Sequence, residues 1–212
     1  EFFDALPVRQ FVREGATSPA LWRERMVTAD GAGGLQFALG PAAPLAALAH
    51  RQADTGPGDV VELCPALPAV VGEICARLAA QGGVALIVDY GGWRSRSDTL
   101  QAVRAHAPAD PLAAPGAADL TAHVDFEAIA RAAHAAGAQA WGPVPQGAWL
   151  GSLGLAARAE ALERTLPEGP QRTSHRAATV RLAAPDRMGT LFKAMALTAP
   201  GAPAPPGFAA PA

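Results

Sequence analysis

The stretch Val84-Ala85-Leu86-Ile87-Val88-Asp89-Tyr90-Gly91-Gly92 decides the fold class of this chain. Its first five residues form a short, continuous apolar run, which is typical of a strand covered on both faces, as in parallel sheets. Polar groups follow at once. Because open α/β sheets bind ligands beyond the carboxyl ends of their strands, Asp89 and Tyr90 are candidate substrate-binding residues. The alternative is that Asp89 only caps the turn that follows.

Strands and helices alternate on both sides of this run. Upstream, period-two patterns predict strands over residues 8–12, 21–27 and 35–39, the last after the turn Gly31-Ala32-Gly33-Gly34, and therefore an antiparallel meander over residues 8–40. Helical spacing and strand patterns predict helices over 59–80, 99–106, 126–136 and 156–166, and strands over 138–144 and 188–197. This order favours an α/β fold with at least one parallel strand pair.

Composition excludes several classes of protein. The 212 residues are 50% hydrophobic and carry a formal net charge of -2, which gives no basic surface for nucleic acid or an anionic membrane. Two cysteines supply neither a disulfide framework nor a paired metal-ligand spacing. No apolar stretch is long enough to span a bilayer. We expect a cytoplasmic protein in which residues 199–212, rich in proline and alanine, form a disordered tail.

Several blocks of the sequence resemble a known family. The blocks are Glu1-Phe2-Phe3-Asp4-Ala5-Leu6-Pro7, Leu86-Ile87-Val88-Asp89-Tyr90-Gly91, Asp98-Thr99-Leu100-Gln101, Asp119-Leu120-Thr121-Ala122-His123-Val124-Asp125-Phe126, Gln146-Gly147 and Met188-Gly189-Thr190-Leu191-Phe192-Lys193. In this order they are similar to blocks of the MidA-type class I S-adenosylmethionine-dependent methyltransferases, a family that includes the complex I assembly methyltransferase.

The resemblance implies a Rossmann-like class I methyltransferase fold, with S-adenosylmethionine as cofactor and a protein arginine side chain as acceptor. Residues 1–198 would be the carboxyl-terminal part of that domain, with the meander as an insertion, and the amino-terminal cofactor-binding strands would be missing. The cofactor-binding residues are therefore expected upstream of Glu1, and the chain need not be active alone. The protein substrate would be a respiratory complex I subunit.

The acceptor side of such an enzyme needs carboxylates, because a guanidinium stays protonated at neutral pH. Glu1 and Asp4 flank two phenylalanines, and we assign these carboxylates a catalytic role in clamping a guanidinium on which Phe2 or Phe3 stacks. The alternative is that Asp4 caps a turn and the phenylalanines belong to the core.

Two further residues are candidate substrate contacts. His123 lies two residues before Asp125, which we expect to cap the following helix, and Gln146 lies in a Pro-Gln-Gly turn. As a metal site the His-x-Asp pair is weak because it supplies two ligands at most, so we predict no metal.

Two other functions stay open. The chain could be a methyltransferase-like scaffold that binds and assembles a partner without turnover, or a metal-dependent hydrolase built on His123, Asp125 and Asp89. The sequence does not define an oligomeric state.

Overall fold

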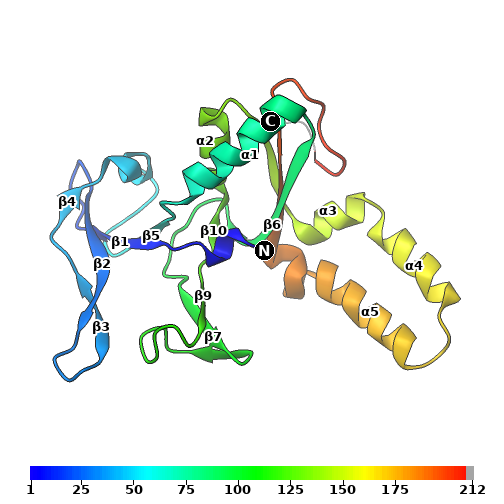
Figure 1. Cartoon of the computed structure of the whole chain (residues 1–212), viewed down its shortest axis with the longest axis horizontal. Coiled ribbons are helices and arrows are strands. Elements are labelled where there is room, and N and C mark those ends of the chain that lie inside the picture. The colour runs from blue at the N-terminus through cyan, green and yellow to red at the C-terminus, as the bar shows by residue number, and fades with distance from the viewer. Residues whose placement is uncertain (209–212) are drawn as a thin grey trace. The chain divides into compact units, whose positions relative to one another are not determined.

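The computed structural model describes residues 1–208 (Figure 1). These residues divide into two compact units. Unit 1 comprises Glu1, Pro68–Trp93 and the chain from Phe126 onward. Unit 2 comprises Phe2–Leu67 and Arg94–Asp125. The predicted meander at residues 8–40 lies within the first of the two segments of unit 2.

Unit 1 is built from a small sheet and helices. Its strands are β6 (Val84–Gly92), β11 (Gln139–Pro145) and β12 (Phe192–Thr198). Its helices are α1 (Leu67–Gln81), α2 (Phe126–Ala135), α3 (Gln146–Ser152), α4 (Leu155–Thr165) and α5 (Pro170–Ala183), followed by the kinked turn η3 (Pro185–Gly189). None of the helices within residues 1–208 combines the length and apolar character that crossing a bilayer requires.

Unit 2 consists mainly of strands. They are β1 (Arg9–Glu14), β2 (Leu21–Ala29), β3 (Leu35–Leu39), β4 (Ala43–Pro44), β5 (Val60–Leu63), β7 (Gln101–Arg104), β8 (Ala107–Ala109), β9 (Asp119–Thr121) and β10 (Val124–Asp125). Two 3₁₀ turns, η1 (Phe3–Ala5) and η2 (Ala46–Arg51), complete it.

In unit 1 the closing strand lies in the middle of the sheet. β12 pairs antiparallel with both β6 and β11, so β6 and β11 run in the same direction on either side of it. The expected parallel strand pair is not formed between β6 and β11, because β12 separates them. The β12 side chains Ala194 to Leu197 are completely buried, which makes this strand the centre of the unit's core.

The predicted helix at residues 126–136 is confirmed, including its stop at Gly137. Gly137 adopts a φ of 77°, and its amide donates to His134 while the amide of Ala138 donates to Ala133. This pair of bonds is the Schellman motif, which needs a residue with positive φ and therefore favours glycine.

β6 is less covered than its apolar sequence suggests. Ile87 and Asp89 are buried on one face, whereas Val84 and Leu86 on the other are 53% and 48% exposed. The prediction that residues 84–88 are covered on both faces is therefore wrong for the start of the strand in this chain. A continuous apolar run reports only that both faces tolerate apolar side chains.

The predicted disordered tail is wrong for residues 199–208. Phe208 is buried against Trp141, Ala194 and Ala196, and the indole nitrogen of Trp149 donates to the Pro206 carbonyl at 3.3 Å. A single large aromatic residue gives this segment an anchor that its proline-rich composition conceals. Residues 209–212 lie outside the described part of the chain.

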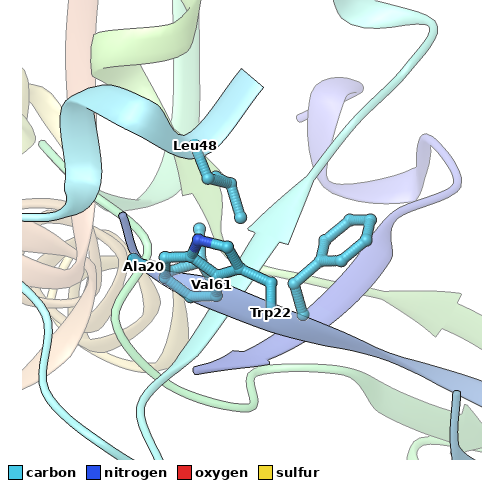
Figure 2. Packing of buried hydrophobic residues seen from close by; sticks show 5 residues of the cluster. Ala20, Trp22, Leu48 and Val61 are labelled. Atoms are coloured by element: carbon cyan, nitrogen blue, oxygen red, sulfur yellow. The ribbon is translucent and has the colours of Figure 1, made fainter. Parts of the chain in front are cut away.

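The predicted antiparallel meander forms the larger sheet of unit 2. The order is β3-β2-β1-β5, with β4 also on β2. Phe11, Trp22 and Val61 from three of its strands pack with Ala20 and Leu48 (Figure 2). Residues 60–63 were expected to begin a helix, but they form β5 because Val60 and Val61 pair with β1. The helical part of that pattern starts at Leu67.

The predicted helix at residues 99–106 is also wrong. Residues 101–104 form β7, which pairs with β8 through a two-residue turn at Ala105 and His106 and with β9 on its other side. Both turn residues have positive φ, 50° and 62°. This geometry matches a type I′ hairpin, for which Asn-Gly is the preferred sequence, so the sequence carried no turn signal there.

We expect the substitution Ala105→Asn together with His106→Gly to stabilise unit 2 by about 1 kcal/mol, because both new residues adopt positive φ without strain. The midpoint of thermal unfolding should rise. Ala109→Asn with Ala107→Gly, at strand positions of the same hairpin, should lower it instead. No rise for the turn variant would contradict the strain at residues 105 and 106.

Candidate functional site

Three of the predicted site residues lie at the carboxyl end of β6. Asp89 is completely buried, and its Oδ1 accepts from the Tyr90 amide at 2.9 Å. The Tyr90 ring packs edge-on against Phe192 of β12, with 5.5 Å between ring centroids. The backbone nitrogen of Glu1 donates to the Val88 carbonyl at 2.7 Å, so Glu1 also lies at this strand end.

Gln146 lies at the corresponding end of β11. Because β6 and β11 run in the same direction, their carboxyl ends meet the same edge of the sheet. The side chain of Gln146 is only 5% exposed, and its Nε2 donates to the Leu182 carbonyl at the end of α5, at 2.8 Å. This bond gives Gln146 a packing role, while its predicted substrate contact remains a prediction.

Lys193 is a residue of this edge that sequence reasoning did not single out. It lies in β12 directly opposite Asp89 of β6 and Pro145 of β11. Its Nζ donates to the carbonyls of Thr190 and Leu191, and burial lowers the pKa of its ammonium group. The only sequence signal for Lys193 was its place at the end of the family-like block at residues 188–193.

Asp4 and His123 belong to unit 2. Asp4 lies in η1 and is buried, and its carbonyl accepts from the Ala122 amide at 2.9 Å. The next residue, His123, is held by its backbone amide, which donates to the Thr99 hydroxyl at 2.8 Å. These bonds place the backbone of Asp4 and of His123 in neighbouring segments.

The phenylalanines between Glu1 and Asp4 differ in exposure. Phe3 is 8% exposed and belongs to the core, whereas Phe2 is 56% exposed, with the two rings edge-on at 5.4 Å. Of the two rings, that of Phe2 is the more exposed to solvent.

Sequence reasoning also missed a network of carboxylate and amide side chains in unit 2. The Nε2 atom of Gln10 donates to Glu62 at 2.8 Å and to Asp98 at 2.6 Å. Glu62 also accepts from the Thr99 amide, and Arg25 donates to both Asp98 and the side-chain amide oxygen (Oε1) of Gln10. The residues come from β1, β2, β5 and the loop before β7, so only the sheet register reveals the network.

Burial alone would raise the pKa of the Asp98 carboxyl, but the hydrogen bonds from Arg25 and Gln10 outweigh it and hold the pKa below its ordinary value. A depressed folded-state pKa contributes stability above the ordinary range of aspartate, and this contribution disappears as the pH falls through the folded-state pKa.

We expect Arg25→Met to raise the pKa of Asp98, so that unit 2 loses less additional stability on acidification below about pH 4 than the wild type does. At pH 7 the variant should be less stable by about 1 kcal/mol or less, because the pair is partly exposed. Urea unfolding at several pH values measures both effects. As a control, Arg104→Met removes an exposed guanidinium from β7 and should leave the pH dependence of stability unchanged. If Arg25→Met and the wild type depended on pH identically, Arg25 would not be the cause of the lowered Asp98 pKa.

Asp125 takes part in a second network of unit 2. Its Oδ2 accepts from the Ser95 amide at 2.9 Å and lies 3.9 Å from a guanidinium nitrogen of Arg51. An adjacent guanidinium repels a cation, which argues against the hydrolase hypothesis that gave Asp125 a metal. Within residues 1–208, no three His, Cys, Asp or Glu side chains group closely enough to hold a metal ion.

The structure thus places Glu1, Asp89, Tyr90 and Gln146 at one sheet edge of unit 1, and Asp4 and His123 in unit 2. A single site that contains all six residues remains a prediction.

Comparison with known proteins identifies the family. Residues 1–144 match the model of a family described as putative S-adenosyl-L-methionine-dependent methyltransferases. The chain belongs to this methyltransferase family. The match includes the predicted site residues from Glu1 to His123 and confirms the resemblance found in the sequence.

Curated relatives and solved structures agree with this membership. The chain is 37% identical over 198 residues to "Protein arginine methyltransferase NDUFAF7, mitochondrial" of Xenopus tropicalis, which covers 91% of this chain and 44% of that protein. A crystal structure of a likely methyl transferase from Burkholderia thailandensis, bound to S-adenosyl-homocysteine, is similar with a TM-score of 0.79 at 31% identity, covering 98% of this chain and 54% of the other. A native structure of a COG1565 superfamily protein from the same organism gives a TM-score of 0.81 at 32% identity, covering 98% of this chain and 56% of the other. The chain therefore spans about half the length of the methyltransferase-family proteins that it matches.

The expectation of a cytoplasmic protein is wrong by this comparison, since the curated relatives of the family are named as mitochondrial proteins. The expectation rested on the low cysteine content and on the lack of an apolar stretch that could span a bilayer, and neither feature distinguishes the cytoplasm from other reducing compartments.

Proposed function

We propose that this chain forms the acceptor side of an S-adenosylmethionine-dependent methyltransferase that modifies an arginine side chain of another protein. The observation that carries the proposal is the group of polar residues at the carboxyl end of β6, where Glu1 is bonded to Val88 next to the buried Asp89. Two comparisons support the proposal: the family match, and the similarity of 91% of the chain to a relative named as a protein arginine methyltransferase.

The proposed chemistry assigns roles to the predicted residues. The acceptor guanidinium is held by carboxylates, for which we propose Glu1 and Asp4, and stacks on the exposed ring of Phe2. Asp89, Tyr90, His123 and Gln146 are proposed to line the substrate site. Carboxylates suit this role because the guanidinium must be oriented and must release a proton when its nitrogen accepts the methyl group.

The glycine clusters of this chain do not fit the cofactor. Residues 31–34 form the turn between the antiparallel strands β2 and β3, and residues 151–154 join α3 to α4. A nucleotide-binding loop instead follows a strand and opens a helix. S-adenosylmethionine supplies the methyl group when bound, and we propose that the residues that bind it lie upstream of Glu1.

The acceptor is proposed to be a protein, with a respiratory complex I subunit as the candidate that the family resemblance suggests. The experiment compares methylarginine in complex I subunits by mass spectrometry, in cells with and without a full-length protein that contains this chain. Loss of a methylarginine in the deleted cells supports the proposal. Unchanged methylarginine throughout would favour the alternative, a methyltransferase-like assembly factor without turnover.

Site variants of the same full-length protein test the proposed roles. We expect Glu1→Gln and Asp4→Asn each to lower kcat/KM for the protein substrate about 10- to 100-fold, because each removes a charge-assisted hydrogen bond to the guanidinium. The exposed residues Glu73 and Asp119 provide matched controls, and Glu73→Gln and Asp119→Asn should leave the rate unchanged. Equal rates for all four variants would remove Glu1 and Asp4 from the site.

A further inference from the structure

The free edge of the meander is a strand without protection against pairing. β3 ends the sheet order, and β2 is its single strand neighbour within residues 1–208. Its sequence, Leu35-Gln36-Phe37-Ala38-Leu39, contains no charge and no proline, and its register with β2 runs without a bulge. Edge strands of monomeric proteins usually carry at least one of these three devices, because an unprotected edge pairs with other chains.

The hydrogen bonds of the hairpin show which backbone groups face this edge. The Asp30 amide donates to Gly34, and the Gly40 amide donates to Glu24. Bonded pairs alternate along an antiparallel ladder, so Gln36 and Ala38 are the residues of β3 that exchange hydrogen bonds with β2. The N–H and C=O groups of Leu35, Phe37 and Leu39 therefore point away from β2.

The side chains of these three residues share one face of the hairpin, because they alternate with Gln36 and Ala38. Leu35 is 40% and Leu39 48% exposed, and Val27, opposite Phe37 on β2, is 51% exposed. The Phe37 ring is covered in part by the Arg25 guanidinium, 3.7 Å from its centroid. Unpaired backbone groups and an exposed apolar strip thus coincide on β3.

We propose that β3 pairs antiparallel with β3 of a second copy of this chain. With Phe37 at the two-fold axis, Phe37 lies opposite Phe37 and Leu35 opposite Leu39, so that all outward backbone groups of the three residues find partners. The pattern is self-complementary, as an isologous interface requires, and places no like charges opposite each other. The joined sheets extend the apolar strip of both hairpins across the axis.

The interface is small, since it consists of one short strand and its neighbours on β2. Interfaces below the usual size are weak and transient, so the dimer is expected to dissociate at concentrations on the order of micromolar.

Sedimentation velocity of the chain over a dilution series tests the proposal. The wild type should pass from dimer to monomer on dilution. Leu35→Lys with Leu39→Lys places lysines opposite each other and should weaken the dimer at least about tenfold. Met26→Lys with Thr28→Lys adds the same charge to the opposite face of β2 and should dimerise like the wild type. A monomeric wild type, or a Leu35/Leu39 variant that dimerises as tightly as the wild type, overturns the proposal.

Amide hydrogen exchange of the wild type gives a test that does not depend on any variant. The amides of Leu35, Phe37 and Leu39 should exchange more slowly as the protein concentration rises, whereas those of Gln36 and Ala38, already bonded to β2, should not change. Exchange that is independent of concentration at all five amides also overturns the proposal.

Discussion

Replacing Arg51 by methionine is expected to destabilise unit 2 by about 3–5 kcal/mol at pH 7, because the change leaves buried acceptors without their cation. The Arg51 side chain is 1% exposed and donates to Asp54 and, at 2.7 Å, to the Ser95 carbonyl. Methionine fills most of the same volume, so the loss reports charge and hydrogen bonding more than packing.

The partners of Arg51 predict how this loss depends on pH. Burial alone would raise the pKa of the Asp54 carboxyl, but Arg51 and the charges of Arg94 and Arg96 outweigh it and lower the pKa. In Arg51→Met the pKa of Asp54 should rise, and the difference in stability from the wild type should shrink as the pH falls and Asp54 becomes protonated.

The control replaces a second arginine that forms an ion pair with the same carboxylate, that of Asp54. Arg96 lies 3.5 Å from Asp54 but is 61% exposed, so Arg96→Met should cost no more than about 1 kcal/mol. Hydrogen exchange localises the effect, since peptides of β1, β2 and β5 should lose protection and peptides of β11 and β12 serve as internal reference. Equal losses for the two arginine variants would show that burial of Arg51 contributes nothing.

The second large effect is expected in α3, where two glycines have opposite surroundings. A Cβ atom on Gly147 would lie 2.3 Å from the Ala183 carbonyl oxygen and 3.1 Å from the Cα of Gly189. These contacts are backbone atoms that no side-chain rotation can relieve. Gly147→Ala should therefore destabilise unit 1 by about 2–3 kcal/mol, by separating α3 from the end of α5.

Gly151 supplies the matched substitution in the same helix. Nothing lies within 4 Å of a Cβ atom there, so Gly151→Ala should stabilise α3 by about 0.5–1 kcal/mol through higher helix propensity. Thermal unfolding of the two variants should move the midpoint in opposite directions. Stabilisation by both alanines would mean that α3 and the end of α5 are not packed this closely.

Sequence patterns predicted the elements whose partners are near in the chain. Period-two alternation gave β3 its bounds and β1 and β2 most of theirs, because a meander pairs successive strands. Helical spacing and Gly137 gave α2, whose amphipathic face and stop are local features. The strand that begins at Val84 was predicted because five consecutive apolar residues followed by Asp89 are typical of a short buried strand.

The errors have a common physical cause. Val60 and Val61 suit a helix face as well as a strand, and pairing with the distant β1 decides between them. The turn at Ala105 and His106 lacks the residues that its geometry prefers, and the packing of Phe208 depends on strands far upstream. Tertiary contacts override local preference in each case.

The same limit applies to the candidate site. The strand pattern predicted Asp89 and Tyr90 just after the strand, whereas the structure has them inside β6, near its carboxyl end. Their part in a substrate site stays a prediction. Strand register places Lys193 opposite Asp89 in unit 1. In unit 2, strand register and a loop residue bring Gln10, Glu62 and Asp98 together. A single sequence reveals neither arrangement.

The position of β12 between β6 and β11 also determines when unit 1 can fold during synthesis. During synthesis β6 and β11 leave the ribosome before residues 192–198 exist, so neither can yet make its pairs with β12, the strand whose side chains are buried in the core of unit 1. The edges that later pair with β12 stay open while the segment from α3 to η3 is made. A chain that stops before Phe192 would keep them open, and such nascent or truncated forms are the ones that should most need chaperones.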